Sequence, residues 1–420
     1  VQRGLKPVHW CSECQTALAE AEVEYRDHSS PSITVAFPLS EDARAGLDLD
    51  TDDDVAALIW TTTPWTLPAN LATALHPDFE YLVVRAHGKL WIVAADLLAA
   101  VSKSAGWNEP ETVKVFKGGI LEGSHYLNPV TGREGLFILA PYVTLEQGTG
   151  LVHTAPGHGA EDYVIGTQYG LEPYAPVGDD GKFTDEVQDW AGLHVHEANA
   201  PIVDRLRELG VLLAHQVVEH SYPHCWRSKN PVIFRATNQW FIRMDRHELR
   251  ERSQEALHTA EWIPHWGEAR IEGMVENRPD WCISRQRMWG VPITVLNCDG
   301  CGAPAVDESV FDHIREVFTA EGADAWYVRE AKDLLPPGYS CSGCSATSFT
   351  KENDILDVWF ESGVSHLAVC DTDRYGLDWP ADLYLEGQDQ YRGWFQSSLV
   401  ASVGLKGCLL YTSDAADELT

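Results

Sequence analysis

Hydrophobic and polar residues alternate in a stretch that begins a short way into the chain, and its apolar members are Ile33, Val35, Phe37 and Leu39. A period of two is typical of a β-strand with one buried face. A further β-rich run covers Val55–Thr61, and apolar runs at 81–84 and 90–93 flank a short polar turn, as in a β-hairpin. Residues 31–215 are therefore predicted to form a mixed, mainly β domain.

Helical periodicity appears towards the end of this region. Pro201 suits the first turn of a helix, and Gly210 suits the position just after the last turn. Between them one helical face is apolar, with Ile202, Leu206 and Leu209. The pattern predicts a helix that starts at Pro201 and ends before Gly210.

Two strand-to-helix units follow near the end of the chain, beginning at Ile355 and Leu383. In the second unit, 383–385 is predicted as a strand and 389–403 as a helix. The buried face of that helix would hold Phe395, Leu399 and Val403. Open α/β sheets bind ligands at the carboxyl ends of their strands. This edge of the sheet offers Glu386, Gly387, Asp389 and Gln390.

The length of 420 residues predicts two or more domains, and 44% hydrophobic with 22% charged residues is a globular balance. No apolar run reaches the roughly eighteen residues of a membrane helix, and Val1 opens no signal-peptide pattern, so we expect a cytoplasmic protein. The formal charge of −32 is unfavourable for phosphate contacts. The chain therefore binds no nucleic acid, or binds it through a local basic patch, or has its main RNA-binding part elsewhere.

Cysteines recur as Cys-x-x-Cys pairs, which favours metal sites in a reducing compartment over disulfides. Two pairs lie close enough in sequence to form one closed tetrahedral site: Cys298, Cys301, Cys341 and Cys344. Four thiolates leave no open position, so a structural Zn²⁺ is predicted there. For Cys11 and Cys14 we expect reduced thiols. A second zinc site is the alternative, with Cys225 as a partner and Ser228 where a fourth cysteine would stand.

Two polar stretches carry candidate chemistry. The first is Thr61-Thr62-Thr63-Pro64-Trp65, where a β-rich run ends in three hydroxyls. These hydroxyls either satisfy a strand rim or position water and a ribose. The second is the glycine-rich loop 148–163, which holds two histidines and two carboxylates. Spacing alone leaves a metal site and a carboxylate facing a ligand ammonium equally open.

Taken together, several motifs resemble those of the isoleucyl-tRNA synthetases, a family of class I aminoacyl-tRNA synthetases. They stand in the family's order at 60–70, 150–163, 221–227 with 239–241, 278–292, 357–363 and 385–395. The isoleucine group is favoured over the valyl and leucyl groups by Thr63, by the sequence at 287–292 and by that at 388–390. A valyl-type synthetase and a free-standing hydrolase that edits tRNA in trans are the alternatives, together with a zinc-ribbon binding module.

The resemblance implies an α/β fold: a partial Rossmann-type catalytic domain with an inserted, mainly β editing domain and a zinc-ribbon-like insert. Its divisions would be a connective segment at 1–30, the editing (CP1) domain at 31–215, the return to the catalytic domain at 216–295, the four-cysteine zinc insert at 296–350, the C-terminal part of the Rossmann domain at 351–407 and a non-native tail at 408–420. We expect this tail to pack poorly.

Family members attach isoleucine to tRNA(Ile) with ATP and Mg²⁺, and hydrolyse valine that is wrongly attached. Asp162 would then hold the α-ammonium of the misattached amino acid, and His153 would help to exclude a larger side chain. Thr62 and Thr63 would position the terminal ribose and the attacking water, and Trp65 and Asn70 would shape the pocket.

In the catalytic part, Glu386, Gly387, Asp389 and Gln390 would grip the aminoacyl-adenylate. Trp359 and Trp394 would wall the isoleucine pocket, with ordinary core packing as their alternative. Arg285 and Arg287 would contact tRNA backbone or carboxylates. The family's His-x-Gly-His and Lys-Met-Ser-Lys-Ser motifs are not in this sequence, so we expect a fragment, monomeric, that does not activate isoleucine by itself.

Overall fold

The computed structural model describes residues 1–49, 53–409 and 413–417. The chain forms two compact units. The first unit comprises Val1–Gly4, Thr16–Ala21 and Gln239–Thr420, and the second comprises Leu5–Gln15 and Glu22–Asn238. Two strands contain residues of both units, β1 (Gln2–Cys11) and β13 (Ile233–Ile242). Within the described part of the chain, no helix is both long and apolar enough to cross a membrane.

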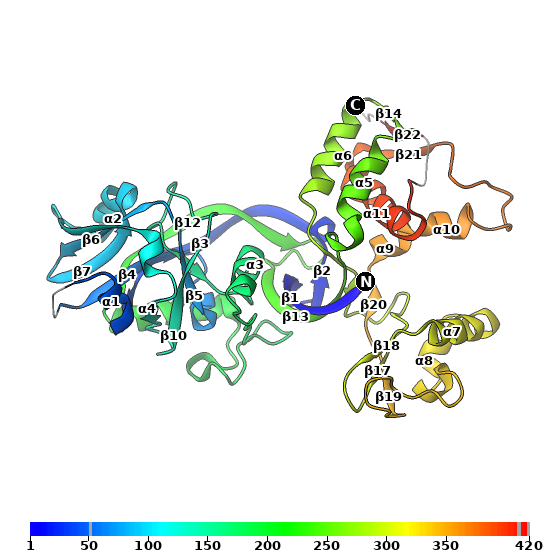
Figure 1. The fold of residues 1–420 in the computed structure, drawn as a ribbon, viewed down its shortest axis with the longest axis horizontal. Coiled ribbons are helices and arrows are strands. Elements are labelled where there is room, and N and C mark those ends of the chain that lie inside the picture. The colour runs from blue at the N-terminus through cyan, green and yellow to red at the C-terminus, as the bar shows by residue number, and fades with distance from the viewer. Residues whose placement is uncertain (50–52, 410–412, 418–420) are drawn as a thin grey trace. The chain divides into compact units, whose positions relative to one another are not determined.

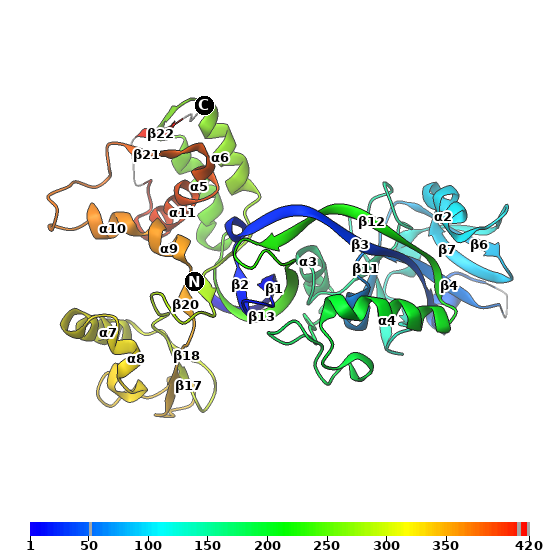
Figure 2. The same ribbon diagram turned by 180° about the vertical axis from the view of Figure 1, so that it is seen from behind.

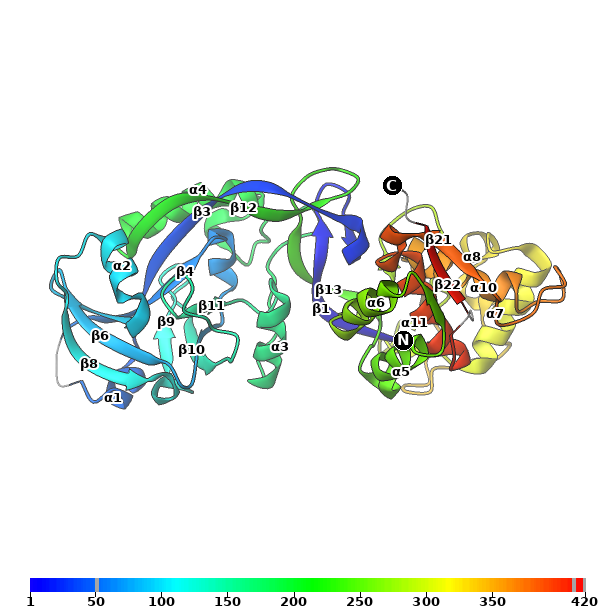
Figure 3. The ribbon, with the colours of Figure 1, turned by 90° about the horizontal axis from the view of Figure 1, so that it is seen from above.

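The second unit is built on one mixed ten-stranded sheet, as the alternation indicates (Figure 1). Its strands are β3 (Val23–Pro38), β4 (Val55–Thr61), β5 (Ala72–Leu75), β6 (Glu80–Ala86), β7 (Lys89–Ala94), β8 (Glu111–Lys117), β9 (His125–Leu127), β10 (Glu134–Leu139), β11 (Val152–Thr154) and β12 (Leu212–Cys225). Most follow the order β8-β6-β7-β4-β11-β5-β10-β9, and β3 pairs with both β4 and β12. The predicted hairpin is confirmed as the antiparallel pair β6–β7, and Figure 3 shows β8 beside β6.

Strand β3 departs from the pattern of one buried face. Ile33, Val35 and Phe37 are buried as predicted, but Thr34 and Ala36 between them are buried as well. A helix, α2 (Leu98–Ala105), accounts for part of this cover, because Val101 and Thr34 line the same small cleft. β3 also continues as a long antiparallel ribbon with β12, which Figure 2 shows from behind.

Three more helices belong to the second unit: α1 (Glu41–Gly46), α3 (Ala160–Gln168) and α4 (Val195–Glu208). The start predicted for α4 is wrong, since Pro201 lies inside the helix rather than in its first turn. His194 begins the helix instead, because its side chain accepts a hydrogen bond from the backbone N–H of His196. The predicted end is correct, and Gly210 follows the helix with a left-handed φ of 69°.

The first unit contains a three-stranded parallel sheet of β14 (Glu261–Ile263), β22 (Ser413–Asp417) and β21 (Tyr384–Gly387). Outside the cysteine-rich insert described below, its α-helices are α5 (Leu249–Leu257), α6 (Trp266–Glu276), α9 (Val358–Gly363), α10 (Ser365–Val369) and α11 (Trp394–Lys406). Short strands complete the unit: β2 (Thr16–Leu18), β15 (Trp281–Cys282), β16 (Ser284–Arg285) and β20 (Ile355–Leu356).

Helix α11 lies at the centre of this unit, packed against α5 and α9 (Figure 1). It begins at Trp394 rather than at Asp389, because a 3-10 turn, Gln388–Tyr391, comes first. Phe395, Leu399 and Val403 are fully buried as predicted. Every residue from 395 to 403 is in fact buried, so the helix has no exposed face over two turns.

The cysteine-rich insert forms its own small antiparallel sheet, β18-β17-β19, from β17 (Leu296–Cys298), β18 (Pro304–Ala305) and β19 (Phe349–Lys351). Two helices, α7 (Glu308–Glu321) and α8 (Ala325–Val328), belong to it. Their apolar residues Val310, Ile314 and Trp326 share one core cluster with Cys298 and Cys341. The cysteine pairs therefore sit at the edge of a packed core.

The prediction that the tail packs poorly is wrong for the part that the structure describes. Leu409 is buried, and Ser413–Asp417 forms the middle strand β22 of the parallel sheet. Strand pairing uses backbone N–H and C=O groups, which every non-proline residue has. A segment without the family's side-chain pattern can therefore still occupy an open strand position.

The central position of α11 predicts a large cost for truncating Phe395. Phe395→Ala should lower the free energy of unfolding by about 3–5 kcal/mol, because it leaves a cavity in a packed core. Leu405→Ala is the matched control on the same helix, since Leu405 is 59% exposed, and its cost should stay within about 0.5 kcal/mol. Denaturant titration measures both, and equal costs would contradict the assigned core.

Candidate functional site

The threonine stretch forms a chain of hydroxyl contacts where β4 ends. Thr61 Oγ1 lies 3.2 Å from Thr63 Oγ1 and accepts a hydrogen bond from the Thr63 backbone N–H at 3.0 Å. Thr63 Oγ1 in turn lies 3.4 Å from Thr66 Oγ1. The two prolines hold this stretch in a short 3-10 helix, Pro64–Ala69. Part of the row is thus satisfied internally, as the strand-rim alternative requires.

His153 joins this row from β11. Its Nε2 lies 2.8 Å from Thr66 Oγ1, and its Nδ1 lies 2.8 Å from Asn70 Nδ2. Asn70 Oδ1 accepts from the hydroxyl of Tyr126 at 2.6 Å, which leaves Nδ2 as the donor to the ring. The proton of a neutral His153 then sits on Nε2 and points to Thr66, which donates to the Thr63 carbonyl at 2.8 Å.

Burial fixes the charge of this histidine. Desolvation lowers the pKa of His153 to about 3, with a smaller contribution from His158, so the ring stays neutral near pH 7. Both ring nitrogens are occupied by hydrogen bonds within the protein. His153 is therefore suited to hold Thr66 and Asn70 in place and is not arranged as a general base.

A cleft of about 470 Å³ opens beside the threonine row within the second unit. Thr62, Thr63 and Trp65 line one side of it, and the other lining residues include His28, Ser30, His196, Asn199, Arg207 and Tyr222. Asn199 Oδ1 accepts from the Trp65 backbone N–H at 3.0 Å and so fixes the tryptophan to α4. The sequence analysis missed Asn199, which lies far from the motif and ahead of the helix start predicted at Pro201.

Asp162 occupies the first turn of α3. Its Oδ2 accepts a hydrogen bond from the backbone N–H of Ala155 at 2.8 Å. Burial raises its pKa to about 6, an effect that this hydrogen bond opposes and Glu161 reinforces. In the described part of the chain, Asp162, His153 and Asn70 are not among the residues that line the cleft. His153 is thus hydrogen-bonded to the threonine row, whereas Asp162 belongs neither to that row nor to the lining of the cleft.

One ring contact connects the glycine-rich loop to the cleft wall. The rings of His158 and Trp65 meet edge to face, with centroids 4.9 Å apart. His158 Nδ1 is 2.9 Å from the Phe234 carbonyl, and burial lowers the pKa of His158 to about 4. His158 is thus a neutral side chain that packs the loop against the ring of Trp65.

The candidate binding residues of the first unit fall into two groups. Trp359, Gln390 and Trp394 lie together: Gln390 Oε1 accepts from the Trp394 backbone N–H at 3.1 Å, and a Cβ on Gly393 would lie 2.9 Å from the Trp359 ring. Trp394 Nε1 donates to the Ser362 carbonyl at 2.9 Å. In the described structure the buried Nε1 of Trp359 has no hydrogen-bond partner.

The acidic residues of that loop are turned to their own neighbours. Glu386 Oε2 accepts from the Gly387 backbone N–H at 3.0 Å, and Asp389 Oδ2 accepts from Gln390 Nε2 at 2.8 Å. Both carboxylates are exposed. They lie at the carboxyl end of β21, as predicted, but do not converge on a common point.

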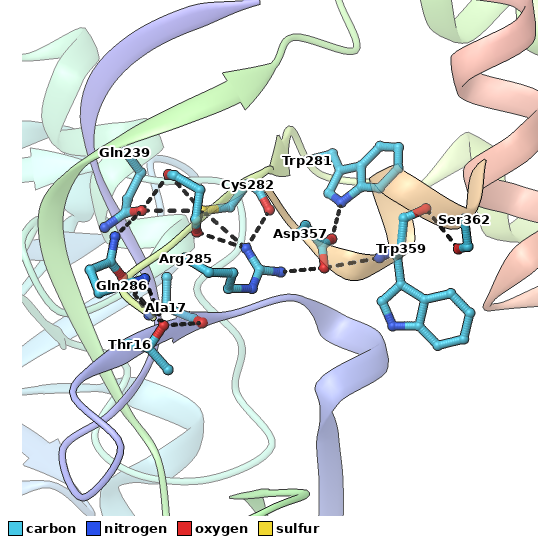
Figure 4. A network of polar contacts seen from close by, with 11 residues as sticks. Thr16, Ala17, Gln239, Trp281, Cys282, Arg285, Gln286, Asp357, Trp359 and Ser362 are labelled. Carbon is cyan, nitrogen blue, oxygen red and sulfur yellow. Dashed lines mark hydrogen bonds and ion pairs between the residues drawn. The ribbon is translucent and has the colours of Figure 1, made fainter. Parts of the chain in front are cut away.

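Arg285 contacts a carboxylate, one of the two options for this residue. It is almost fully buried, and its Nη2 lies 3.2 Å from Asp357 Oδ1 (Figure 4). Burial rules out the other option, a contact with tRNA backbone, in the conformation described. Asp357 opens the motif at 357–363, but the sequence alone indicates no role for this residue.

The four insert cysteines come together. Their Sγ atoms all lie within 4.8 Å of one another, with Cys298–Cys344 and Cys301–Cys341 each 3.5 Å apart. Gly300 turns the chain tightly enough for its N–H to reach Cys298 Sγ at 3.4 Å. This donor set fits a tetrahedral ion such as Zn²⁺.

A second thiol cluster forms in the second unit from Cys11, Cys14 and Cys225. Ser228 Oγ lies 3.3 Å from Cys11 Sγ, at the corner that a fourth cysteine would fill. Three converging thiols can hold a metal ion, so the second site remains open beside the expected reduced thiols.

Metal analysis separates these cases. The chain should bind about one zinc through the insert, and about two if the second cluster is also a site. Cys344→Ser should remove the first ion, since three thiolates hold Zn²⁺ less well than four, whereas Cys370→Ser should leave the content unchanged. Elemental analysis of the purified protein gives the count, and zinc retained in Cys344→Ser would contradict the insert site.

Asp162 should titrate near pH 6 in the folded protein. The folded pKa lies above the ordinary value of 3.8, so the carboxyl's contribution favours folding when protonated and is lost as the pH rises from about 4 to about 6. Carbon NMR of labelled aspartate carboxyls measures this step, which should vanish in Asp162→Asn. A carboxyl already ionised well below pH 5 would disprove the effect of burial.

The sequence is similar to those of known aminoacyl-tRNA ligases. Three relatives are each named "Isoleucine--tRNA ligase". The Persephonella marina protein is 55% identical over 414 residues, covering 96% of this chain and 43% of its own length. The Nitratidesulfovibrio vulgaris protein is 53% identical, covering 98% and 44%, and the Syntrophotalea carbinolica protein is 51% identical, covering 98% and 44%.

The chain thus spans less than half the length of these relatives. A solved structure, described as the crystal structure of GlLeuRS-CP1, aligns with 44% of this chain and 99% of its own at 15% identity and a TM-score of 0.37, which is too distant to support an argument. The family described as tRNA synthetases class I (I, L, M and V) matches residues 1–413. On these matches the chain belongs to the class I tRNA synthetases.

Proposed function

We propose that the protein to which this chain belongs attaches isoleucine to tRNA(Ile) at the expense of ATP, and that the second unit removes valine attached in error. The relatives at 51–55% identity support the amino-acid assignment. The cleft beside Thr62, Thr63 and Trp65 is the observation on which the editing assignment rests. We further propose a cytoplasmic, monomeric enzyme with structural Zn²⁺ in the insert.

A second site is needed because a binding pocket discriminates poorly against a smaller side chain. One methylene gives only about a hundredfold preference, a limit for which synthetases of this kind are themselves the standard example. A hydrolytic pocket that admits valine and excludes isoleucine multiplies that ratio. Such a pocket must be rigid, and the bonds from His153 to Thr66 and Asn70 supply rigidity here.

The hydrolysis requires no covalent intermediate. Water attacks the ester carbonyl, and the hydroxyls of Thr62 and Thr63 would orient this water and the terminal ribose. Trp65 and Asn70 would bound the side-chain pocket. Asp162 would pair with the α-ammonium, which requires an ionised carboxylate and therefore a pH above about 6. Since Asp162 lies outside the cleft lining, this role rests on the family resemblance.

In the first unit, Trp359 and Trp394 would wall the isoleucine pocket, and Glu386, Gly387, Asp389 and Gln390 would bind the adenylate. ATP and Mg²⁺ would supply the phosphate chemistry of activation. A free-standing hydrolase would need none of these residues. The family match over both units favours a synthetase over that alternative.

Asp162→Ala tests the editing role. In the complete synthetase it should slow hydrolysis of valyl-tRNA(Ile) at least about a hundredfold, because the ammonium loses its charged partner. Glu161→Ala is the matched control, since its exposed carboxylate lies one residue away, and its rate should stay within about twofold. Deacylation of labelled valyl-tRNA gives the rates, and an unchanged rate in Asp162→Ala would remove the carboxylate from the mechanism.

A further inference from the structure

Asp357 is a carboxylate without exposed surface. Its Oδ2 accepts from the indole N–H of Trp281 at 2.8 Å, and its Oδ1 accepts from the backbone N–H of Trp359 at 3.2 Å. The guanidinium of Arg285 approaches Oδ1 at 3.2 Å. Figure 4 shows these groups converging on one carboxylate from β15, β16 and α9.

Arg285 is itself fixed by the backbone that presents it. Its Nη1 donates to the carbonyls of Cys282 at 2.9 Å and of Ser284 at 2.8 Å. Ser284 and Arg285 form β16, which pairs with β20 through Leu356 and Ile355. A buried ion pair is favourable only when further hydrogen bonds support its charges, and here Arg285 Nη1 and both oxygens of Asp357 take part in such bonds.

The carboxylate determines where α9 begins. This helix has only six residues, Val358–Gly363, too few to be stable without external contacts. Asp357 is its N-cap, and the capped N–H belongs to Trp359. The first turn of α9, and with it the direction of the Trp359 side chain, therefore depends on Asp357.

Trp359 in turn faces the loop that leads into α11. Its ring packs so closely against Gly393 that a Cβ there would overlap it, and the Ser362 carbonyl of α9 accepts from the indole of Trp394. A rotation of α9 would move the Trp359 ring away from Gly393 and shift the Ser362 carbonyl that holds the Trp394 indole. Trp359 and Trp394 are the two residues proposed above to wall the isoleucine pocket.

We infer that Asp357, held by Arg285 and Trp281, is a positioning residue that sets the amino-acid pocket by orienting Trp359. The inference rests on the proposed isoleucine activation, but it concerns residues that do not touch the amino acid. It separates two roles of Asp357, because the cap needs only an acceptor oxygen whereas the pair with Arg285 needs a charge.

The test uses ATP–pyrophosphate exchange by the complete synthetase. Asp357→Asn keeps an oxygen for the Trp359 N–H, but it leaves the Arg285 cation buried without a counter-charge and turns an amide NH2 towards the Trp281 indole, which loses its acceptor. It should raise KM for isoleucine about tenfold, because a buried ion pair that anchors the start of α9 is lost, with kcat and KM for ATP within about twofold. Arg285→Lys, which keeps the charge and loses the forked donor, should act in the same direction.

A coupling measurement distinguishes positioning from general weakening of the fold. In a Trp359→Ala background, Asp357→Asn should raise KM less than about twofold further, since the ring it positions is gone. Asp307→Asn, at the exposed N-cap of α7 in the insert, is the matched control and should leave KM unchanged.

Three outcomes would overturn the inference. A tenfold rise of KM that persists in the Trp359→Ala background would show that Asp357 does not act through that ring. An unchanged KM in both folded single variants would show that the pair does not set the pocket. Exchange by the unmodified synthetase that does not depend on isoleucine would refute the proposed function first, and the inference with it.

Discussion

A buried polar group destabilises the protein unless it finds a hydrogen-bond partner, and this constraint shapes one polar network in each unit. In the second unit, Tyr126, Asn70, His153 and Thr66 satisfy one another in sequence from β9 to the threonine row. In the first, Trp281, Arg285 and the N–H of Trp359 satisfy Asp357. An unpaired member of either set would cost on the order of 1–3 kcal/mol, so each arrangement persists only as a whole.

The same constraint has different consequences in the two units because the charges differ. The His153 set is neutral, since burial keeps the ring unprotonated, and its members can be fixed without a counter-charge. The Asp357 set contains a full ion pair, so removing either partner leaves a buried charge. The neutral network around His153 can keep the threonine row rigid without a counter-charge. The ion pair of Asp357 with Arg285, in contrast, makes the position of α9 sensitive to a single substitution.

The sequence predicts local features well and long-range burial poorly. The alternation of apolar and polar residues correctly predicts strand β3, and the apolar runs at 81–84 and 90–93 correctly predict the β6–β7 hairpin. Both patterns depend only on residues that are close in sequence. The alternation did not reveal that Thr34 is buried, since α2 covers that face from a distant segment. Pro201 predicts a helix start, but α4 begins earlier, where the side chain of His194 caps its first turn.

For the candidate site, family motifs suggest residues but not their partners. Arg285 and Asp357 lie in separate motifs, and only the strand pair β16–β20 shows that they meet. Asn199 has no motif at all. Asp162 shows the opposite error, because its motif suggests the cleft whereas its carboxylate accepts from Ala155 outside the lining.

The net negative charge of the chain is unfavourable for binding phosphates, but it is less unfavourable for binding an uncharged ligand in the cleft. Within the cleft, Arg207 is paired with Asp204, and burial lowers the pKa of His196 to about 4 and, with nearby histidines, lowers that of His28. The lining therefore offers hydroxyls and neutral rings rather than a field of positive charge. The substrate proposed for the cleft, an aminoacyl ester with its terminal ribose, is uncharged apart from the ammonium, so such a lining suits it. If the proposal holds, the phosphates of the tRNA would be bound by other surfaces.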